Sequence, residues 1–227
     1  MRREVPACVI TIDLRGSRKM RNRAAVQVRV FRVLRLLRHR FSNDLLTGFR
    51  LTGGDEFQGV LRKPDKVMDV FKLVRRFLGV DFYCGVGIGG IATPIRERSV
   101  EMDGSAFHRS KEAMSRAKRE RTELVIVTQN KGIERDMNTV IQLILHTSHR
   151  WTAKQREVIA FLEDHPNATQ TEAARHFRVS KQAISNTLSR AGWDQVRKGY
   201  ALLEIWLERL GVRQSRGVYF AESIRRR

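Results

Sequence analysis

The sequence predicts an α/β domain followed by an all-α domain. In the first 130 of its 227 residues, short β-branched or glycine-containing runs alternate with longer segments whose apolar residues recur at helical spacing. From residue 131 onward the segments have helical spacing, and turn residues separate them. We therefore predict a palm domain, a connecting helix, a DNA-binding domain, and a C-terminal helix with a basic tail, at residues 1–130, 131–149, 150–193 and 194–227.

The front half alternates strands and helices in an order that restricts its topology. Gly53-Gly54 joins two short strands into a hairpin. The predicted strands lie at residues 5–14, 49–61 (both arms of the hairpin), 82–93 and 123–127, and the predicted helices at 20–41, 65–78 and 105–118. The resulting order, β-α-β-β-α-β-α-β, is the split βαβ arrangement of a ferredoxin-like palm.

Glycines thin the strand predicted at residues 82–93. Gly87, Gly89 and Gly90 have part of the spacing of a dinucleotide fingerprint, but the segment continues as a strand and opens no helix, so we reject that interpretation. We interpret these glycines, together with Gly85, as small residues in a strand that a helix crosses closely.

Residues 150–193 have the pattern of a helix-turn-helix unit. A first amphipathic helix ends at Pro166, and a second helix follows it. Val179 is expected to fill the turn after the second helix. Ser180 is a good N-cap for the third helix.

The third helix of this unit carries the chemistry for reading DNA. Ile184 and Leu188, four residues apart, face the core. The outward face then holds Lys181, Gln182, Ser185, Asn186, Ser189 and Arg190. Gln and Asn pair bidentately with adenine, whereas Lys and Arg bind guanine or phosphate. We therefore expect double-stranded DNA as a partner, and a helical bundle without DNA contact is the alternative.

This segment resembles the helix-turn-helix of bacterial regulators, such as the fourth region of sigma factors and the winged-helix repressors. The resemblance covers residues 150–193 and departs at Arg178, where such proteins usually have glycine in the turn. An arginine there must either tolerate or avoid a positive φ angle.

The net charge of +20 is the strongest signal in the composition. Residues 1–130 hold 27 basic and 14 acidic residues, and residues 131–227 hold 17 and 10. A surplus of this size attracts polyanions, of which nucleic acid is the usual one, although a need for solubility accounts for it equally well. The arginines spaced along the helix predicted at residues 20–41 form either a solvated face or a phosphate-binding one.

The remaining composition indicates a cytoplasmic protein without a membrane partner. The sequence contains no apolar run of about 18 residues, and its N-terminus lacks the apolar stretch of a signal peptide. Cys8 and Cys84 both lie in apolar, strand-like runs. We interpret them as reduced packing residues.

Carboxylates follow the first strand and the hairpin glycines. Asp13 ends the first strand, and Asp55 and Glu56 follow Gly53-Gly54. If strand and hairpin are neighbours, Asp13 and Asp55 face each other at one edge of the sheet. Such a pair typically holds Mg²⁺ or Mn²⁺, which clamps a triphosphate. Gly53 and Gly54 allow the backbone to approach a phosphate, and Lys118 is a cation within reach.

Three segments of the front half resemble nucleotide cyclases. Gly53-Gly54-Asp55-Glu56-Phe57 is the GGDEF signature of diguanylate cyclases, and Asp13-Leu14-Arg15-Gly16 resembles the Asp-x-x-Gly stretch of class III nucleotide cyclases. The helix that ends at Lys118 resembles the last GGDEF-domain helix. With its segment at residues 102–107, the whole chain most resembles the SatD family of bacterial proteins.

The resemblance implies roles for individual residues. Asp13, Asp55 and the carbonyl of Leu14 would bind Mg²⁺ or Mn²⁺, and Glu56 would assist them. Gly53 and Gly54 would approach the nucleotide, and Lys118 would hold its phosphates. In the cyclases, the metals activate a ribose 3′-hydroxyl for attack on an α-phosphate. The sequence departs from the diguanylate cyclases where they read guanine, because it has Arg18, Lys19, Arg21 and Arg23 there.

Three functions remain open from the sequence. The first is a DNA-binding regulator whose cyclase-like domain senses a nucleotide bound with Mg²⁺. The second is an active nucleotidyl cyclase that makes a cyclic nucleotide signal from an NTP. The third is a nucleic-acid-associated structural protein with a vestigial pocket. We expect a homodimer, because helix-turn-helix proteins usually read paired half-sites, with the helix predicted at residues 193–210 as the dimer contact.

Overall fold

The computed structural model describes residues 4–17 and 22–224, with only the backbone described from residue 212 onward. The chain folds as two compact units. The first comprises the residues up to 138 and those from 203, and the second comprises residues 139–202. The domain boundaries predicted from the sequence stay predictions.

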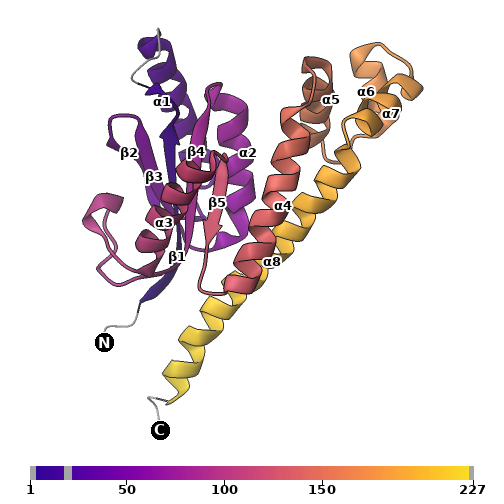
Figure 1. Ribbon diagram of the computed structural model, residues 1–227. Helices are drawn as coiled ribbons and strands as arrows, with labels where there is room; N and C mark the ends of the chain where they lie inside the picture. Colours follow the sequence, from indigo (N-terminus) through magenta and orange to yellow (C-terminus); the bar gives the residue numbers. More distant parts are fainter. Residues whose placement is uncertain (1–3, 18–21, 225–227) are drawn as a thin grey trace. The chain divides into compact units, whose positions relative to one another are not determined.

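The first unit is built around a five-stranded sheet (Figure 1). Its elements are β1 (Val5–Leu14), α1 (Arg23–Arg40), β2 (Leu45–Gly53), β3 (Glu56–Leu61), η2 (Pro64–Lys66), α2 (Val67–Leu78), β4 (Phe82–Ile91), η3 (Ser99–Glu101), α3 (Ser105–Glu120) and β5 (Leu124–Val127). The strand order is β2-β3-β1-β4-β5; β4 and β5 are parallel and the other neighbours antiparallel. The order of the five strands is the predicted one, a split βαβ arrangement followed by the strand β5, and it confirms the α/β fold class.

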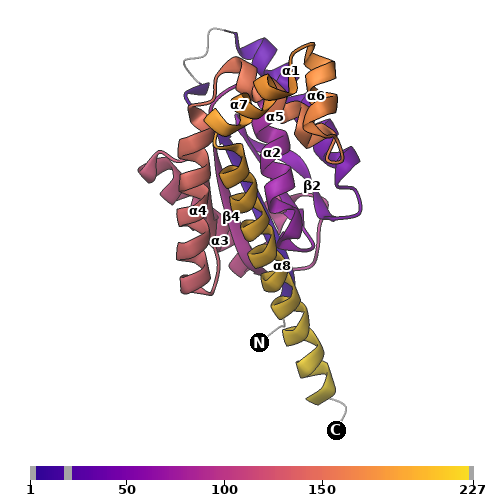
Figure 2. The ribbon, with the colours of Figure 1, turned by 90° about the vertical axis from the view of Figure 1, so that its right-hand side faces the viewer.

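Helices cover both faces of the sheet, so β1 at its centre is buried on both sides. Phe71 of α2 packs on Phe82 of β4 with ring centroids 5.9 Å apart, which places α2 on one face. On the other face lies α3 (Figures 1 and 2). The Thr11 and Ser110 hydroxyls of β1 and α3 share a 2.9 Å hydrogen bond. Two-sided burial explains why β1 is an unbroken apolar run in the sequence and not an alternating one.

The glycines of β4 allow α3 to lie directly on the sheet. A Cβ atom added to Gly85 would lie 2.5 Å from the backbone nitrogen of Met114, and one added to Gly89 would lie 2.8 Å from that of Ala106. A Cβ on Gly87 would overlap the carbonyl oxygen of Ala106. The interpretation of these three glycines as a close helix crossing is therefore confirmed.

The first turns of α4 (Lys131–His149) close the outer edge of β5 with side chains. The Asn138 amide accepts a hydrogen bond from the Ile126 N–H (2.9 Å) and donates one to the Ile126 carbonyl (2.7 Å). The Glu134 carboxylate accepts a hydrogen bond from the Thr128 N–H (2.9 Å). These side chains replace a neighbouring strand, so the polar backbone groups of the edge are satisfied.

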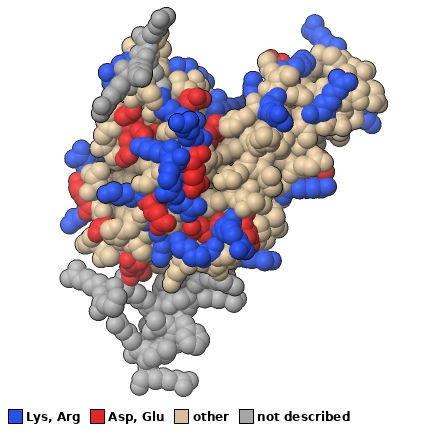
Figure 3. Space-filling view, viewed as in Figure 1, with Lys and Arg blue, Asp and Glu red and all other residues tan. Residues whose placement is uncertain are grey.

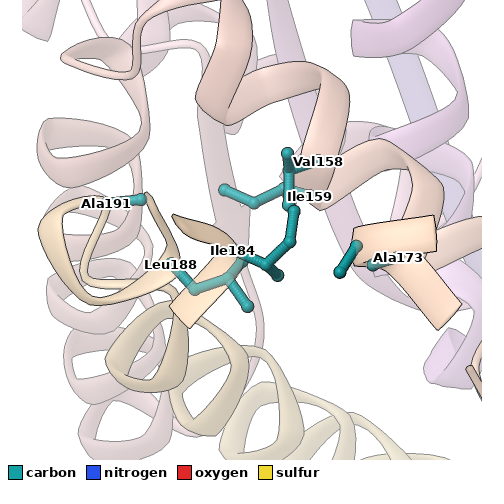
Figure 4. Close-up of a cluster of buried hydrophobic side chains, with 7 residues drawn as sticks. Val158, Ile159, Ala173, Ile184, Leu188 and Ala191 are labelled. Carbon is teal, nitrogen blue, oxygen red and sulfur yellow. The ribbon is translucent and has the colours of Figure 1, made fainter. Parts of the chain in front are cut away.

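The second unit holds a three-helix cluster with its own core (Figure 4). Its helices are α5 (Ala153–Asp164), α6 (Gln170–Phe177) and α7 (Lys181–Arg190), followed by α8 (Trp193–Ile224). Val158, Ile159, Ala173, Ile184 and Leu188 are buried together. The predicted all-helical region is therefore confirmed. Both α4 and α8 have residues in each unit, and α8 is longer than the helix predicted at residues 193–210.

One strand begins earlier than predicted. β2 starts at Leu45, four residues before the predicted residue 49. The Leu45 and Asp44 N–H groups both donate to the Phe41 carbonyl at 3.0 Å, so the chain leaves α1 through a tight turn and enters the strand at once.

We predict that Gly87→Ala destabilises the first unit. The added Cβ would press on backbone atoms of Ala106 and Ser110, which cannot rotate away. Overpacking of about 2 kcal/mol should lower the melting temperature by roughly 5 °C in a thermal shift assay. Gly48→Ala is the control, because nothing lies within 4 Å of its added Cβ. Equal melting temperatures for the two variants would contradict the predicted clash.

Candidate nucleotide site and nucleic-acid interface

Asp13 of β1 lies beside a lysine and opposite a glutamate. The Lys118 Nζ of α3 is 2.6 Å from Asp13 Oδ2, and the Asp13 side chain is 16% exposed. In the β1–β3 register, Asp13 is the partner of Glu56, so both side chains project from the same face of the sheet. The structure thus brings together three of the predicted site residues on the face that α3 covers.

The hairpin turn is displaced by one residue from its predicted position. Gly53 pairs with Glu56, which leaves Gly54 and Asp55 as the two turn residues in place of Gly53-Gly54. Gly54 has a φ angle of +55°, as the first position of a type II′ turn requires, whereas Gly53 belongs to the strand. Consequently the expectation that Asp13 faces Asp55 is corrected, because Glu56 is the residue opposite Asp13.

Asp55 lines a pocket of about 150 Å³ on the α1 side of the sheet. Leu14 and Gly54 also line it, so three predicted site residues share this pocket. The remaining walls are apolar Val26, Val30 and Leu51 and polar Ser17, Arg23 and Gln27. The two groups of site residues therefore lie on either side of the end of the sheet, joined through the hairpin.

The hairpin holds Glu56 and leaves space over its glycines. Thr52 Oγ1 donates a 2.7 Å hydrogen bond to Glu56 Oε1 and so fixes the orientation of the carboxylate. Nothing lies within 4 Å of the positions where Gly53 or Gly54 would carry a Cβ. That space permits the close backbone approach expected for a phosphate.

The donor set fits a metal ion that arrives with a nucleotide. Within residues 4–17 and 22–224, no three His, Cys, Asp or Glu side chains gather closely enough to hold a metal ion. Mg²⁺ is commonly bound by one or two carboxylates together with substrate phosphates. Asp13 and Glu56 supply two carboxylates at one place, and Asp55 supplies a third in the adjoining turn.

Several residues near the site were not predicted from the sequence. The Arg15 guanidinium lies 4.2 Å over the ring of Tyr83 and donates to the Arg121 carbonyl (3.3 Å). Arg23 and Gln27 of α1 both line the pocket, and their spacing of four residues on one helix was the available signal. Arg18, Lys19 and Arg21, named with Arg23 in the sequence, lie outside the described residues.

The charges over the sheet are mixed. On the face seen in Figure 3, acidic side chains accompany the basic ones over α3, and no continuous basic field forms. Glu134 shows the same balance at one residue, because Arg116 and Lys131 both bind its carboxylate, at 2.7 and 3.0 Å. On this face the surplus of positive charge does not outline a nucleic-acid surface.

The polar residues of α7 are presented outward as predicted. Ile184 and Leu188 are 1% and 8% exposed. Lys181, Gln182, Asn186, Ser189 and Arg190 are exposed, and Ser185 is half-buried. Gln182 Nε2 donates a 3.0 Å hydrogen bond to Asn186 Oδ1, which aligns two amides along the helix.

Polar caps fix where the helices of this unit begin. Thr152 and Thr169 form capping boxes at the starts of α5 and α6, and Ser180 accepts from the Ala183 N–H at the start of α7. Residues 178–180 join α6 to α7, a turn of the length typical of a helix-turn-helix. Ser180 is therefore the N-cap of α7, as predicted from the sequence.

Two residues of the turn settle expectations from the sequence. Arg178 adopts the left-handed conformation (φ +54°), so it tolerates the geometry that usually selects glycine. Val179 is 38% exposed and does not fill the turn as expected. Phe177 packs against the core instead, with its ring 5.7 Å from that of Phe161.

By its fold, this protein belongs to the class that joins an N-terminal α/β domain to a C-terminal all-helical region. The chain belongs to the SatD family, whose family model matches residues 8–194, and this confirms the resemblance found in the sequence. The fold is similar to that of a bacterial light-regulated adenylyl cyclase, with a TM-score of 0.41 and 11% identity over 55% of this chain and 76% of that one.

A second similar structure is a regulator of polyketide synthase expression from Bifidobacterium adolescentis. Its TM-score is 0.25, with 13% identity over 92% of this chain and 81% of that one. Comparison with the curated proteins gave no match. Among the described helices, none has the length and apolarity that a membrane span requires.

We predict that the second unit loses stability in acid through Glu172. Hydrogen bonds from Thr169 lower the pKa of this carboxyl below its ordinary value. A lowered pKa stabilises the fold above the unfolded-state pKa, and the gain is lost as pH falls through the folded pKa. The melting temperature, followed by tryptophan fluorescence, should therefore fall less steeply between pH 6 and about pH 3 in Glu172→Gln than in the native chain. Glutamine keeps the capping box without the charge, so identical slopes would contradict this role.

Proposed function

We propose that this protein is a DNA-binding regulator whose front domain binds a nucleotide together with Mg²⁺ or Mn²⁺. The observation that carries the proposal is the exposed polar face of α7, held on a buried core by Ile184 and Leu188. A helix that is capped, short and anchored on one side presents its other side as a rigid reading surface.

Gln182 and Asn186 lie at the centre of this proposed reading surface. Their mutual hydrogen bond uses one Gln182 N–H and the Asn186 oxygen, and it leaves the Gln182 oxygen and the Asn186 amide free for bases. Adenine offers one acceptor and one donor in the major groove, which suits such amides. Lys181 and Arg190, at the two ends of α7, would contact guanine or phosphate.

In the front domain, we propose that the phosphates of the nucleotide lie near Asp13, Glu56 and Lys118. Lys118 already neutralises Asp13 at 2.6 Å, and its side chain is 47% exposed, so it is free to turn toward a phosphate. A bound Mg²⁺ would neutralise phosphate charge and lower the pKa of a coordinated hydroxyl. The pocket that Asp55 lines would then take the remainder of the nucleotide.

The second candidate is an active nucleotidyl cyclase, which the grouping of Asp13, Glu56 and Lys118 favours. In that reaction the ribose 3′-oxygen forms a bond to the α-phosphorus and pyrophosphate leaves. The carboxylates would position the attacking hydroxyl and Lys118 would hold the leaving phosphates. If no nucleotide binds, the third function applies, which is a nucleic-acid-associated structural protein with a vestigial pocket.

A homodimer through α8, the helix expected from the sequence as the dimer contact, would use apolar residues that α8 exposes. Leu203 and Leu207 are fully buried within the chain, and Leu210 is 7% exposed. Leu202 and Ile205, three residues apart, are 38% and 46% exposed. We propose that a partner subunit would contact α8 through these two residues.

We predict that Gln182→Ala weakens binding to a DNA sequence selected from random duplexes by about ten-fold, because a bidentate base contact contributes about 1–3 kcal/mol. Fluorescence anisotropy at fixed salt measures the loss. Gln195→Ala is the matched control, an exposed glutamine in the same unit outside α7. An equal loss in both variants, or no sequence selection at all, would refute α7 as the reading helix.

We predict a nucleotide response in the front domain that depends on Asp55. Each of the four NTPs is incubated with the protein and Mg²⁺ or Mn²⁺, followed by a thermal shift assay and mass spectrometry of the products. Metal-dependent stabilisation without a product supports the regulator, and a cyclic product supports the cyclase. Asp55→Asn should abolish either response, whereas Asp136→Asn, an exposed carboxylate outside the site, should not. No response to any NTP would leave the structural role.

A further inference from the structure

A second concave surface lies on the outer side of the first unit, between α1 and β2. It is a groove of about 610 Å³. Its lining residues are Phe31, Leu34, Arg35 and Arg38 of α1 and Phe49, Arg50 and Leu51 of β2. Four of these are apolar and three are arginines. Only Leu51 is shared with the pocket of Asp55, so the groove is a separate site.

The groove exposes large apolar side chains. Phe31 is 52% exposed and Leu51 is 40% exposed. β2 is the outer strand of the sheet, so no neighbouring strand covers this side. Apolar residues that gather on a surface beside polar ones are typical of an interaction site.

The charged side chains that line the groove are all arginines. Arg35 and Arg38 are exposed, and neither has a hydrogen bond or ion pair with any described residue. Arg50 forms an exposed ion pair with Glu97 at 3.2 Å, and no acidic side chain of the described residues lines the groove. A partner that offers apolar side chains flanked by carboxylates is therefore complementary to this surface.

Two other occupants fit less well. A second copy of this chain packed symmetrically on the groove would bring its arginines against those of the first copy, which is repulsive. Single-stranded nucleic acid binds through stacking on exposed aromatic rings, and Phe31 is the one such ring here, because Phe49 is 2% exposed. Leu34 and Leu51 offer aliphatic contacts, which suit apolar side chains better than bases.

We propose that this groove docks an acidic amphipathic segment of a partner protein. The apolar side chains of that segment pack on Phe31, Leu34 and Leu51, and its carboxylates pair with Arg35 and Arg38. This is the helix-in-groove mode of peptide recognition, with arginines at the rim setting the orientation. The proposal rests on the lining residues of the groove, their exposure and their charge, and it does not depend on nucleotide or DNA binding.

The probe is a fluorescein-labelled helical peptide of leucine and glutamate, with its leucines spaced along one face. We expect saturable binding to the full chain in fluorescence anisotropy. Arg38→Glu and Phe31→Ala should each raise Kd about ten-fold. Arg40→Glu is the control for the charge reversal, and Val28→Ala is the control for removal of an exposed apolar side chain. Both positions are exposed on α1 and lie outside the groove lining.

The outcomes separate the occupants. Equal binding of polyglutamate would show that charge alone attracts the peptide, and equal weakening by the control variants would show that the groove is not the site. Binding of an oligothymidylate that the same two variants weaken would assign the groove to nucleic acid. A dimer in sedimentation velocity that Phe31→Ala dissociates would assign it to a second copy. Each of these four results overturns the proposal.

Discussion

The rest of the first unit depends on the direct contact of α3 with the glycine face of β4. Three glycines let the helix backbone touch the strand, and no side chain separates them. The hydroxyl of Ser110 then reaches both Thr11 of β1 and the Gly85 carbonyl, at 2.9 and 3.0 Å. At this distance α3 has one position across the sheet, because sideways movement is blocked by backbone atoms.

That single position sets two polar contacts at the C-terminal end of the helix. Lys118 reaches Asp13 at the end of β1, and Arg116, two residues earlier, reaches Glu134 at the start of α4. Both ion pairs are carried by one rigid helix. Asp13 of β1 and Glu134 of α4 are therefore both paired with the same helix.

Most of the fold could be predicted from the sequence, because its signals are local. The order of strands and helices was predicted from the spacing of apolar residues. The glycines of β4 predicted that a helix crosses the strand closely. The start of β2 was missed because the turn of four residues after α1 has no glycine or proline to mark it. The α7 face was predictable for the same local reason, since Ser180 fixes its start and Ile184 its buried side.

The candidate site was harder to predict because it depends on register. Gly53-Gly54-Asp55 allows the hairpin turn at either of two positions. The separate register between β1 and β3 decides whether Asp55 or Glu56 stands opposite Asp13. The ion pair between Asp13 and Lys118 joins residues more than 100 positions apart, so no local pattern contains it. Arg23 was named from the sequence only as a departure from the diguanylate cyclases, and Gln27 was overlooked because polar residues on a helix usually face solvent.

Arg178 shows that the second unit is less stable than its sequence could make it. A non-glycine residue in the left-handed region costs about 1 kcal/mol, and glycine at the same place would cost little. The chain thus keeps a cation next to the start of α7 at the expense of stability. A change at residue 178 therefore alters both the stability of the second unit and the charge beside α7. It leaves the outward side chains of α7 unchanged.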